Sequence, residues 1–138
     1  MINKLLLIDD DELTTYLLQK LIKGVREVKE FVIKENGLEA FEYLEGLSRK
    51  GESFPNIILL DIDMPVMNGF EFVELYEKRY WRKHMELKLV MITSSKRKMD
   101  FERSLSFQSV SDCIYKPISR EKMEYILGEA YSLHVNKL

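Results

Sequence analysis

Apolar residues fall into five short runs along the chain, and each run has the length of an ordinary β-strand. The runs cover residues 4–8, 30–33, 56–60, 87–92 and 112–115. Two stretches, LLLI at residues 5–8 and IILL at residues 57–60, are apolar at every position. Consecutive apolar positions are typical of strands that are buried on both faces, as in the centre of a parallel sheet.

Between these runs, apolar residues recur three or four positions apart, and this spacing predicts amphipathic helices. The marking residues are, in chain order, Leu13, Leu17 and Leu21; Leu38, Phe41, Leu44 and Leu47; Phe72, Val73, Tyr76 and Tyr80; and Met123, Ile126, Leu127 and Ala130. A further stretch at residues 99–107 is weakly patterned. Five strands that alternate with five helices favour an α/β fold, in which helices cover both faces of a parallel sheet.

The composition is that of one globular domain: 46% of the 138 residues are hydrophobic, 32% are charged, and no linker or repeat interrupts the chain. We therefore expect a single domain over residues 1–138. The formal net charge of -2 provides no positive field to hold nucleic acid. Cys113 is the single cysteine, which suits a reducing compartment. Without a signal peptide or an apolar run of roughly 20 residues, we expect a cytoplasmic protein that does not enter a membrane.

Polar residues whose side chains could bind a ligand or take part in a reaction follow four of the five predicted strands. They are Asp9 and Asp10 after the first, Asp61 after the third, Thr93 and Ser94 after the fourth, and Lys116 after the fifth. The carboxyl ends of parallel strands meet at one edge of the sheet, where such folds bind ligands. We therefore expect three acids, a hydroxyl group and a lysine to converge there.

Three clustered carboxylates repel one another unless a cation lies among them, and Mg²⁺ prefers such oxygen ligands. We expect Asp10 and Asp61 to bind Mg²⁺ directly, with Asp9 nearby or acting through water. Lys116 adds a positive charge and Thr93 a hydroxyl donor, so the set could support phosphoryl transfer to a carboxylate. Each residue alone also has a structural interpretation, and Asp11 is expected to be only the N-cap of the first helix.

Four segments, in this order, resemble the receiver domain of two-component response regulators: LLLIDDDE, NIILLDIDMPVMNGFEF, LVMITSS and CIYKPI. The resemblance extends over residues 3–134. It implies a flavodoxin-like three-layer α/β sandwich with strand order 2-1-3-4-5. It also implies the following roles: Asp61 as phosphoacceptor, Asp9 and Asp10 as metal-site acids, the backbone carbonyl of Asp63 as a further metal ligand, Thr93 as switch hydroxyl, the backbone N–H of Ser94 as a phosphoryl contact, Lys116 as the family's lysine, and a cis Lys116–Pro117 bond.

Three positions depart from the family pattern. Cys113 stands where the family has an aromatic switch residue, three positions before the lysine, and a thiol cannot move in and out as a ring does. Tyr115 faces the same side of its strand as position 113, so we expect it to take part in the readout. Asp63 replaces a frequent asparagine, and the basic run at residues 96–98 is either a solvated helix start or a docking patch.

By this resemblance, a sensor histidine kinase or a histidine phosphotransfer protein phosphorylates Asp61. The chain is expected to be a switch rather than an enzyme, with self-catalysed phosphorylation and dephosphorylation. We expect no output domain after the last helix, so that the signal passes to an unknown downstream protein by contact or by onward phosphotransfer.

Two other functions compete with this interpretation. Asp61 and Asp63 also fit the DxD motif of haloacid-dehalogenase-type phosphatases, but there the DxD follows the first strand, whereas here the acid pair comes first. A pseudo-receiver that only binds a partner would be expected to have a broken site, yet Asp10, Asp61, Thr93 and Lys116 are all present.

Overall fold

The computed structural model describes residues 2–25 and 28–136, which form a five-stranded parallel sheet with helices on both faces. The strands are β1 (Ile2–Ile8), β2 (Val28–Lys34), β3 (Ile57–Asp61), β4 (Lys88–Thr93) and β5 (Val110–Tyr115). The helices are α1 (Glu12–Val25), α2 (Gly37–Lys50), α3 (Gly69–Arg79), α4 (Lys98–Ser106) and α5 (Arg120–Asn136), with a short 3₁₀ turn η1 (Trp81–Lys83) after α3.

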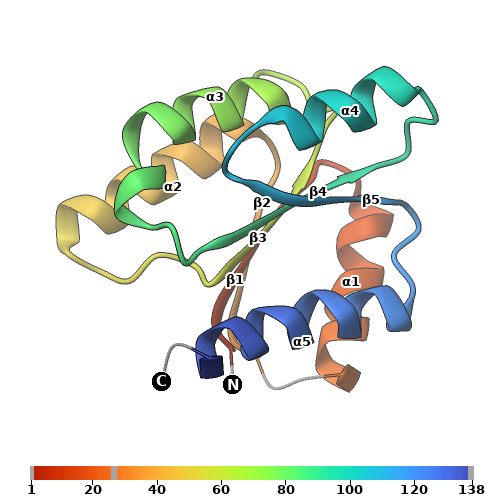
Figure 1. The fold of residues 1–138 in the computed structure, drawn as a ribbon, viewed down its shortest axis with the longest axis horizontal. Coiled ribbons are helices and arrows are strands. Elements are labelled where there is room, and N and C mark those ends of the chain that lie inside the picture. The colour runs from red at the N-terminus through yellow and green to blue at the C-terminus, as the bar shows by residue number, and fades with distance from the viewer. Residues whose placement is uncertain (1, 26–27, 137–138) are drawn as a thin grey trace.

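The sheet order is β2-β1-β3-β4-β5, and every neighbouring pair is parallel. Helices α1 and α5 lie on one face, and α2, α3 and α4 lie on the other (Figure 1). This arrangement confirms the predicted three-layer α/β fold and its strand order. The first strand is longer than predicted, because Ile2 continues the ladder by pairing with Val28 of β2.

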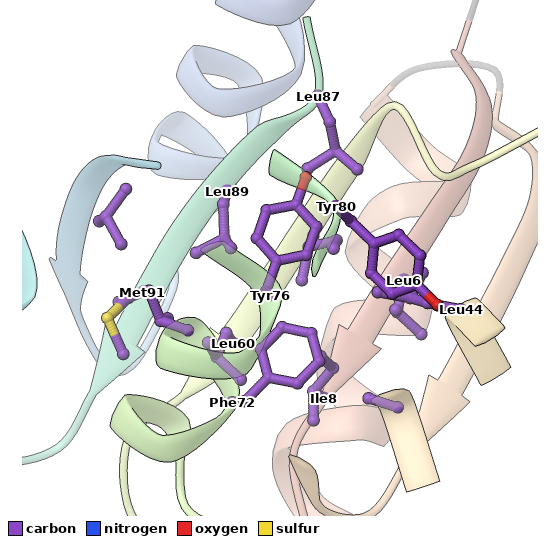
Figure 2. Packing of buried hydrophobic residues seen from close by; sticks show 14 of the residues in the cluster. Leu6, Ile8, Leu44, Leu60, Phe72, Tyr76, Tyr80, Leu87, Leu89 and Met91 are labelled. Atoms are coloured by element: carbon purple, nitrogen blue, oxygen red, sulfur yellow. The ribbon is translucent and has the colours of Figure 1, made fainter. Parts of the chain in front are cut away.

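The two faces of the sheet build separate cores, and successive residues of the central strands alternate between them. In β1, Leu6 points to the core under α2 and α3, whereas Leu7 points to the core under α1 and α5. Both residues are fully buried. Figure 2 shows the first core, where the rings of Phe72 and Tyr76 from α3 lie over residues of the strands, including Leu60. This two-sided burial explains why the central strands have apolar residues at consecutive positions.

Helix α1 turns a different face to the sheet than the sequence spacing suggested. Its buried residues are Leu18 and Ile22, whereas Leu13 and Leu17 are 64% and 46% exposed. Both stripes have apolar residues four positions apart, so periodicity alone could not choose between them. The side chain of Ala130 in α5, which the sequence also marked, lies outside the described side chains.

No helix within the described part of the chain combines the length and the apolar composition that a bilayer crossing requires.

Candidate functional site

Three carboxylates from distant parts of the sequence come together at the carboxyl edge of the sheet. Asp61 is the last residue of β3, and Asp9 and Asp10 follow β1. One oxygen atom of each residue lies within 4.8 Å of the others. Asp9 and Asp61 are buried, and Asp10 is exposed to solvent. An all-oxygen donor set with one open side fits a hard divalent cation such as Mg²⁺.

Lys116 brings the positive charge to this cluster from the end of β5. Its Nζ lies 2.8 Å from Asp9 Oδ2 and 3.4 Å from Asp61 Oδ1. Its backbone N–H donates to the carbonyl oxygen of Thr93 at 2.8 Å, which ties the end of β5 to the end of β4. Burial alone would lower the pKa of Lys116, but the hydrogen bond to Asp9 and the charge of Asp61 outweigh it and raise that pKa. The following Lys116–Pro117 bond is cis, as the resemblance implied.

Both carboxylate oxygens of Asp9 already have partners. Oδ1 accepts the backbone N–H of Asp11 at 2.9 Å, and Oδ2 pairs with Lys116. Asp11 lies directly before α1, and its carbonyl oxygen accepts the backbone N–H of Thr15 at 3.1 Å, as expected for the N-cap position. Its side chain accepts the Thr14 hydroxyl at 2.6 Å. Because Asp9 is committed to these contacts, Asp10 and Asp61 are the better candidates for direct cation ligands.

The carboxyl group of Asp61 has an unusual affinity for protons. Burial and the charge of Asp9 raise the pKa of Asp61 to about 7, although Lys116 acts in the opposite direction. A single lysine does not neutralise the acid cluster, so the ionised form of Asp61 is destabilised until a further positive charge arrives. A divalent cation would supply that charge.

This pKa predicts how the stability of the metal-free protein depends on pH. The pKa of Asp61 is about 7 in the folded state, well above the 3.8 of an unperturbed aspartate, so folding favours the protonated form. The free energy of unfolding should therefore decrease as the pH rises from about 4 to about 7. Urea unfolding in EDTA at pH 5 and pH 7.5 measures this. Asp61→Asn should be stabilised relative to wild type more strongly at pH 7.5; an equal effect at both pH values would contradict the shift.

Thr93 and Ser94 lie beside the acid cluster where β4 ends. Thr93 is buried, and its Oγ1 accepts the backbone N–H of Ser95 at 2.9 Å. Ser94 is exposed and lines a surface pocket of about 290 Å³ with Lys96, Tyr115 and Lys116. The pocket gives solvent and small molecules a way to approach the lysine.

The loop after Asp61 is fixed by the start of α3. Asn68 and Glu71 form a capping box, with reciprocal bonds of 2.9 Å and 3.0 Å between side chain and backbone. The N–H of Gly69 donates to the carbonyl oxygen of Ile62 at 2.8 Å. The side chain of Asp63 is exposed and does not belong to the carboxylate group found among the described residues.

The two expected switch positions on β5 both face α4. Cys113 is 4% exposed and lies next to Ser104 of α4. Tyr115 is 42% exposed and stacks on Phe101 with ring centroids 5.4 Å apart. The polar residues of α4 that contact this region were not predicted from the sequence. The sequence feature that could have indicated them is the high number of serines in and around this weakly apolar helix.

The geometry agrees with the comparisons to known proteins. The family described as the response regulator receiver domain matches residues 5–127. The chain belongs to this family. Receiver domains are phospho-accepting switches rather than classical enzymes, bind Mg²⁺, and interact with histidine kinases and phosphotransfer proteins.

Individual relatives resemble the chain over most of its length. The sensor histidine kinase CheAY of Helicobacter pylori is 31% identical over 130 residues, 93% of this chain and 15% of that protein. The transcriptional regulatory protein CpxR homolog of Haemophilus influenzae is 33% identical over 124 residues, 88% of this chain and 47% of that protein. The chain therefore spans less than half the length of either. A two-component response regulator from Cytophaga hutchinsonii has a similar structure, with a TM-score of 0.85, 25% identity, and coverage of 95% of this chain and 98% of that one.

Proposed function

We propose that this receiver accepts a phosphoryl group on Asp61, with Mg²⁺ held by Asp10 and Asp61 and by the backbone carbonyl of Asp63. The observation that carries the proposal is the convergence of three carboxylates within 4.8 Å around a buried aspartate that Lys116 already contacts. A bound Mg²⁺ would neutralise the acid cluster and the phosphoryl oxygens.

The residues of the chain then have distinct tasks. A carboxylate oxygen of Asp61 attacks the phosphorus atom of a phosphohistidine, the P–N bond breaks, and its electron pair returns to the imidazole. The Lys116 ammonium, 3.4 Å from Asp61, balances charge on the transferred group. The Thr93 hydroxyl and the Ser94 backbone N–H donate to the phosphoryl oxygens. Later attack by water on phosphorus releases inorganic phosphate and restores the carboxylate. Because Lys116 and a bound cation would balance the phosphoryl charge in this step as well, dephosphorylation is self-catalysed.

The phosphoryl donor is a sensor histidine kinase or a histidine phosphotransfer protein, and the aspartyl phosphate biases the α4–β5 region toward a second state. This single receiver domain, residues 1–138, passes the signal to another protein by contact or by onward phosphotransfer. A cytoplasmic location suits its one cysteine, which is free and buried.

Metal dependence tests this function. Incubation with acetyl phosphate and Mg²⁺ should add one phosphoryl mass to the intact protein, and EDTA should prevent it. Asp10→Ala removes a direct ligand, so we expect Mg²⁺ affinity and the phosphorylation rate to fall together, by roughly 10-fold or more. Mass spectrometry and Mg²⁺ titration give the two quantities.

Asp112→Ala, on β5 and away from the acid cluster, is the matched control and should leave both quantities unchanged. Wild-type Mg²⁺ affinity in Asp10→Ala would remove Asp10 from the metal site. Repeated turnover of a small phosphate ester would instead favour a phosphatase, and the absence of any phosphoryl mass would favour a pseudo-receiver.

A further inference from the structure

Helix α4 packs on the sheet with very little buried apolar surface. Among its described residues, only Ser104 is fully buried, and that residue is polar. Phe101 and Arg103 contribute partly exposed contacts: Phe101 stacks on Tyr115, and the Arg103 guanidinium lies 4.2 Å from the ring centroid of Phe70. A helix with so little apolar burial is weakly fixed, so its position depends on its polar contacts.

Those polar contacts begin at the switch hydroxyl. The Ser95 N–H donates to Thr93 Oγ1 at 2.9 Å, and the Ser95 hydroxyl donates to Asp100 Oδ2 at 2.7 Å. Arg97 Nη2 pairs with the same Asp100 oxygen at 3.0 Å. The residue before α4, Arg97, provides no side-chain cap, so Ser95 and Asp100 organise the first turn of the helix in its place.

The polar contacts continue through the helix to β5. The backbone carbonyl of Asp100 accepts the hydroxyl of Ser104 at 2.9 Å, and Ser104 is in turn a buried neighbour of the Cys113 thiol. Ser104 and Cys113 are 0% and 4% exposed. A chain of hydrogen bonds thus leads from the end of β4 to the buried Ser104 of α4, which lies next to the position where the family has its aromatic residue.

We propose that Thr93, Ser95, Asp100 and Ser104 form a hydrogen-bonded relay that transmits the state of Asp61 to α4 and to its buried contact with Cys113, in place of a moving aromatic ring. The inference rests on the proposed phosphorylation of Asp61. Ser95 and Asp100 are positioning residues in it, because neither contacts the acceptor carboxylate.

The coupling follows from the cost of an unpaired polar group. A hydroxyl has one proton and two acceptor sites, so Thr93 can accept from Ser95 and donate to a phosphoryl oxygen. When Thr93 turns toward the phosphoryl group, the half-buried Ser95 N–H loses its acceptor unless the backbone moves with it. Movement of Ser95 shifts Asp100 through the hydrogen bond between their side chains, and the first turn of α4 moves with Asp100.

The first test needs no ligand. Ser95→Ala removes the bond to Asp100, and amide hydrogen exchange across residues 98–101 should become about fivefold faster, the factor expected for the loss of one typical hydrogen bond. Ser95→Thr keeps the hydroxyl and should restore slow exchange. Glu102→Gln, on the exposed side of the same helix, is the matched control and should change exchange by less than about twofold. Unchanged exchange in Ser95→Ala would overturn the relay.

The second test measures transmission. Beryllofluoride with Mg²⁺ mimics the phosphoryl group, and wild-type amide chemical shifts should change both near Asp61 and Lys116 and across residues 98–106. In Ser95→Ala the changes near Asp61 should remain, while those across α4 should fall below about half. Undiminished α4 changes in that variant would overturn the relay and leave the proposed function intact. If the wild-type amide chemical shifts near Asp61 did not change, the proposed function would be contradicted. The relay would then have no phosphorylation of Asp61 to transmit and would be overturned with it.

Discussion

Replacement of Asp61 by asparagine is expected to abolish phosphoryl incorporation, because the amide cannot act as the nucleophile. With acetyl phosphate and Mg²⁺, the phosphorylated fraction should fall by about 100-fold or more, as measured by intact mass. We do not expect unfolding to cause this loss. Burial and the charge of Asp9 raise the pKa of Asp61 to about 7, so a neutral side chain should make the metal-free protein more stable at neutral pH.

Asp112→Asn is the appropriate control, because this aspartate lies on β5 and uses Oδ1 only to accept the backbone N–H of Cys113, which the asparagine oxygen can also do. It should incorporate phosphate like the wild type. A phosphoryl mass that persists in Asp61→Asn and maps to another residue would remove Asp61 as the acceptor.

Gly69→Ala is expected to destabilise the fold by about 2–3 kcal/mol and lower the melting temperature by roughly 10 °C. A Cβ at this position would overlap the carbonyl oxygen of Asp61 and would lie 3.0 Å from the Cα of Ile62. Both are backbone atoms, so a side chain cannot rotate away to relieve the clash. Thermal unfolding measures the loss, and a shift of β3 relative to α3 should also slow phosphorylation of Asp61.

Gly46→Ala provides the comparison within the same protein. Gly46 lies inside α2, and nothing is within 4 Å of the Cβ that alanine would add. Alanine has the higher helix propensity, so this variant should gain about 0.5–1 kcal/mol. If both substitutions had the same effect, contact with Asp61 would not be what makes position 69 sensitive.

The fold was predictable because strands that are buried on both faces have apolar residues at consecutive positions, and this pattern is easy to recognise in the sequence. The runs at residues 5–8 and 57–60 are apolar throughout, and in the structure neighbouring residues there fill opposite cores. The orientation of α1 was not predictable in the same way. Leu17 and Leu18 are adjacent and equally apolar, and only contact with β-strand residues decides that Leu18 is the buried one.

The acid cluster was predictable for a different reason. In a parallel sheet, a residue that follows a strand must lie at the carboxyl edge, so sequence position alone placed Asp10 and Asp61 together. The partners of Asp9 and the polar contacts of α4 were not predictable. They depend on side-chain directions, such as that of Ser95 toward Asp100, which have no periodic signature in the sequence.

The burial of Cys113 also makes the wild-type chain a convenient background for site-directed labelling. Cys113 is the single cysteine of the sequence, and the residue is 4% exposed. Burial raises the pKa of that thiol, and maleimides react with the thiolate. A cysteine introduced at the 78% exposed Met99 would therefore react far faster than Cys113. A fluorophore or spin label could be attached to α4 without first replacing the native cysteine and disturbing its contact with Ser104.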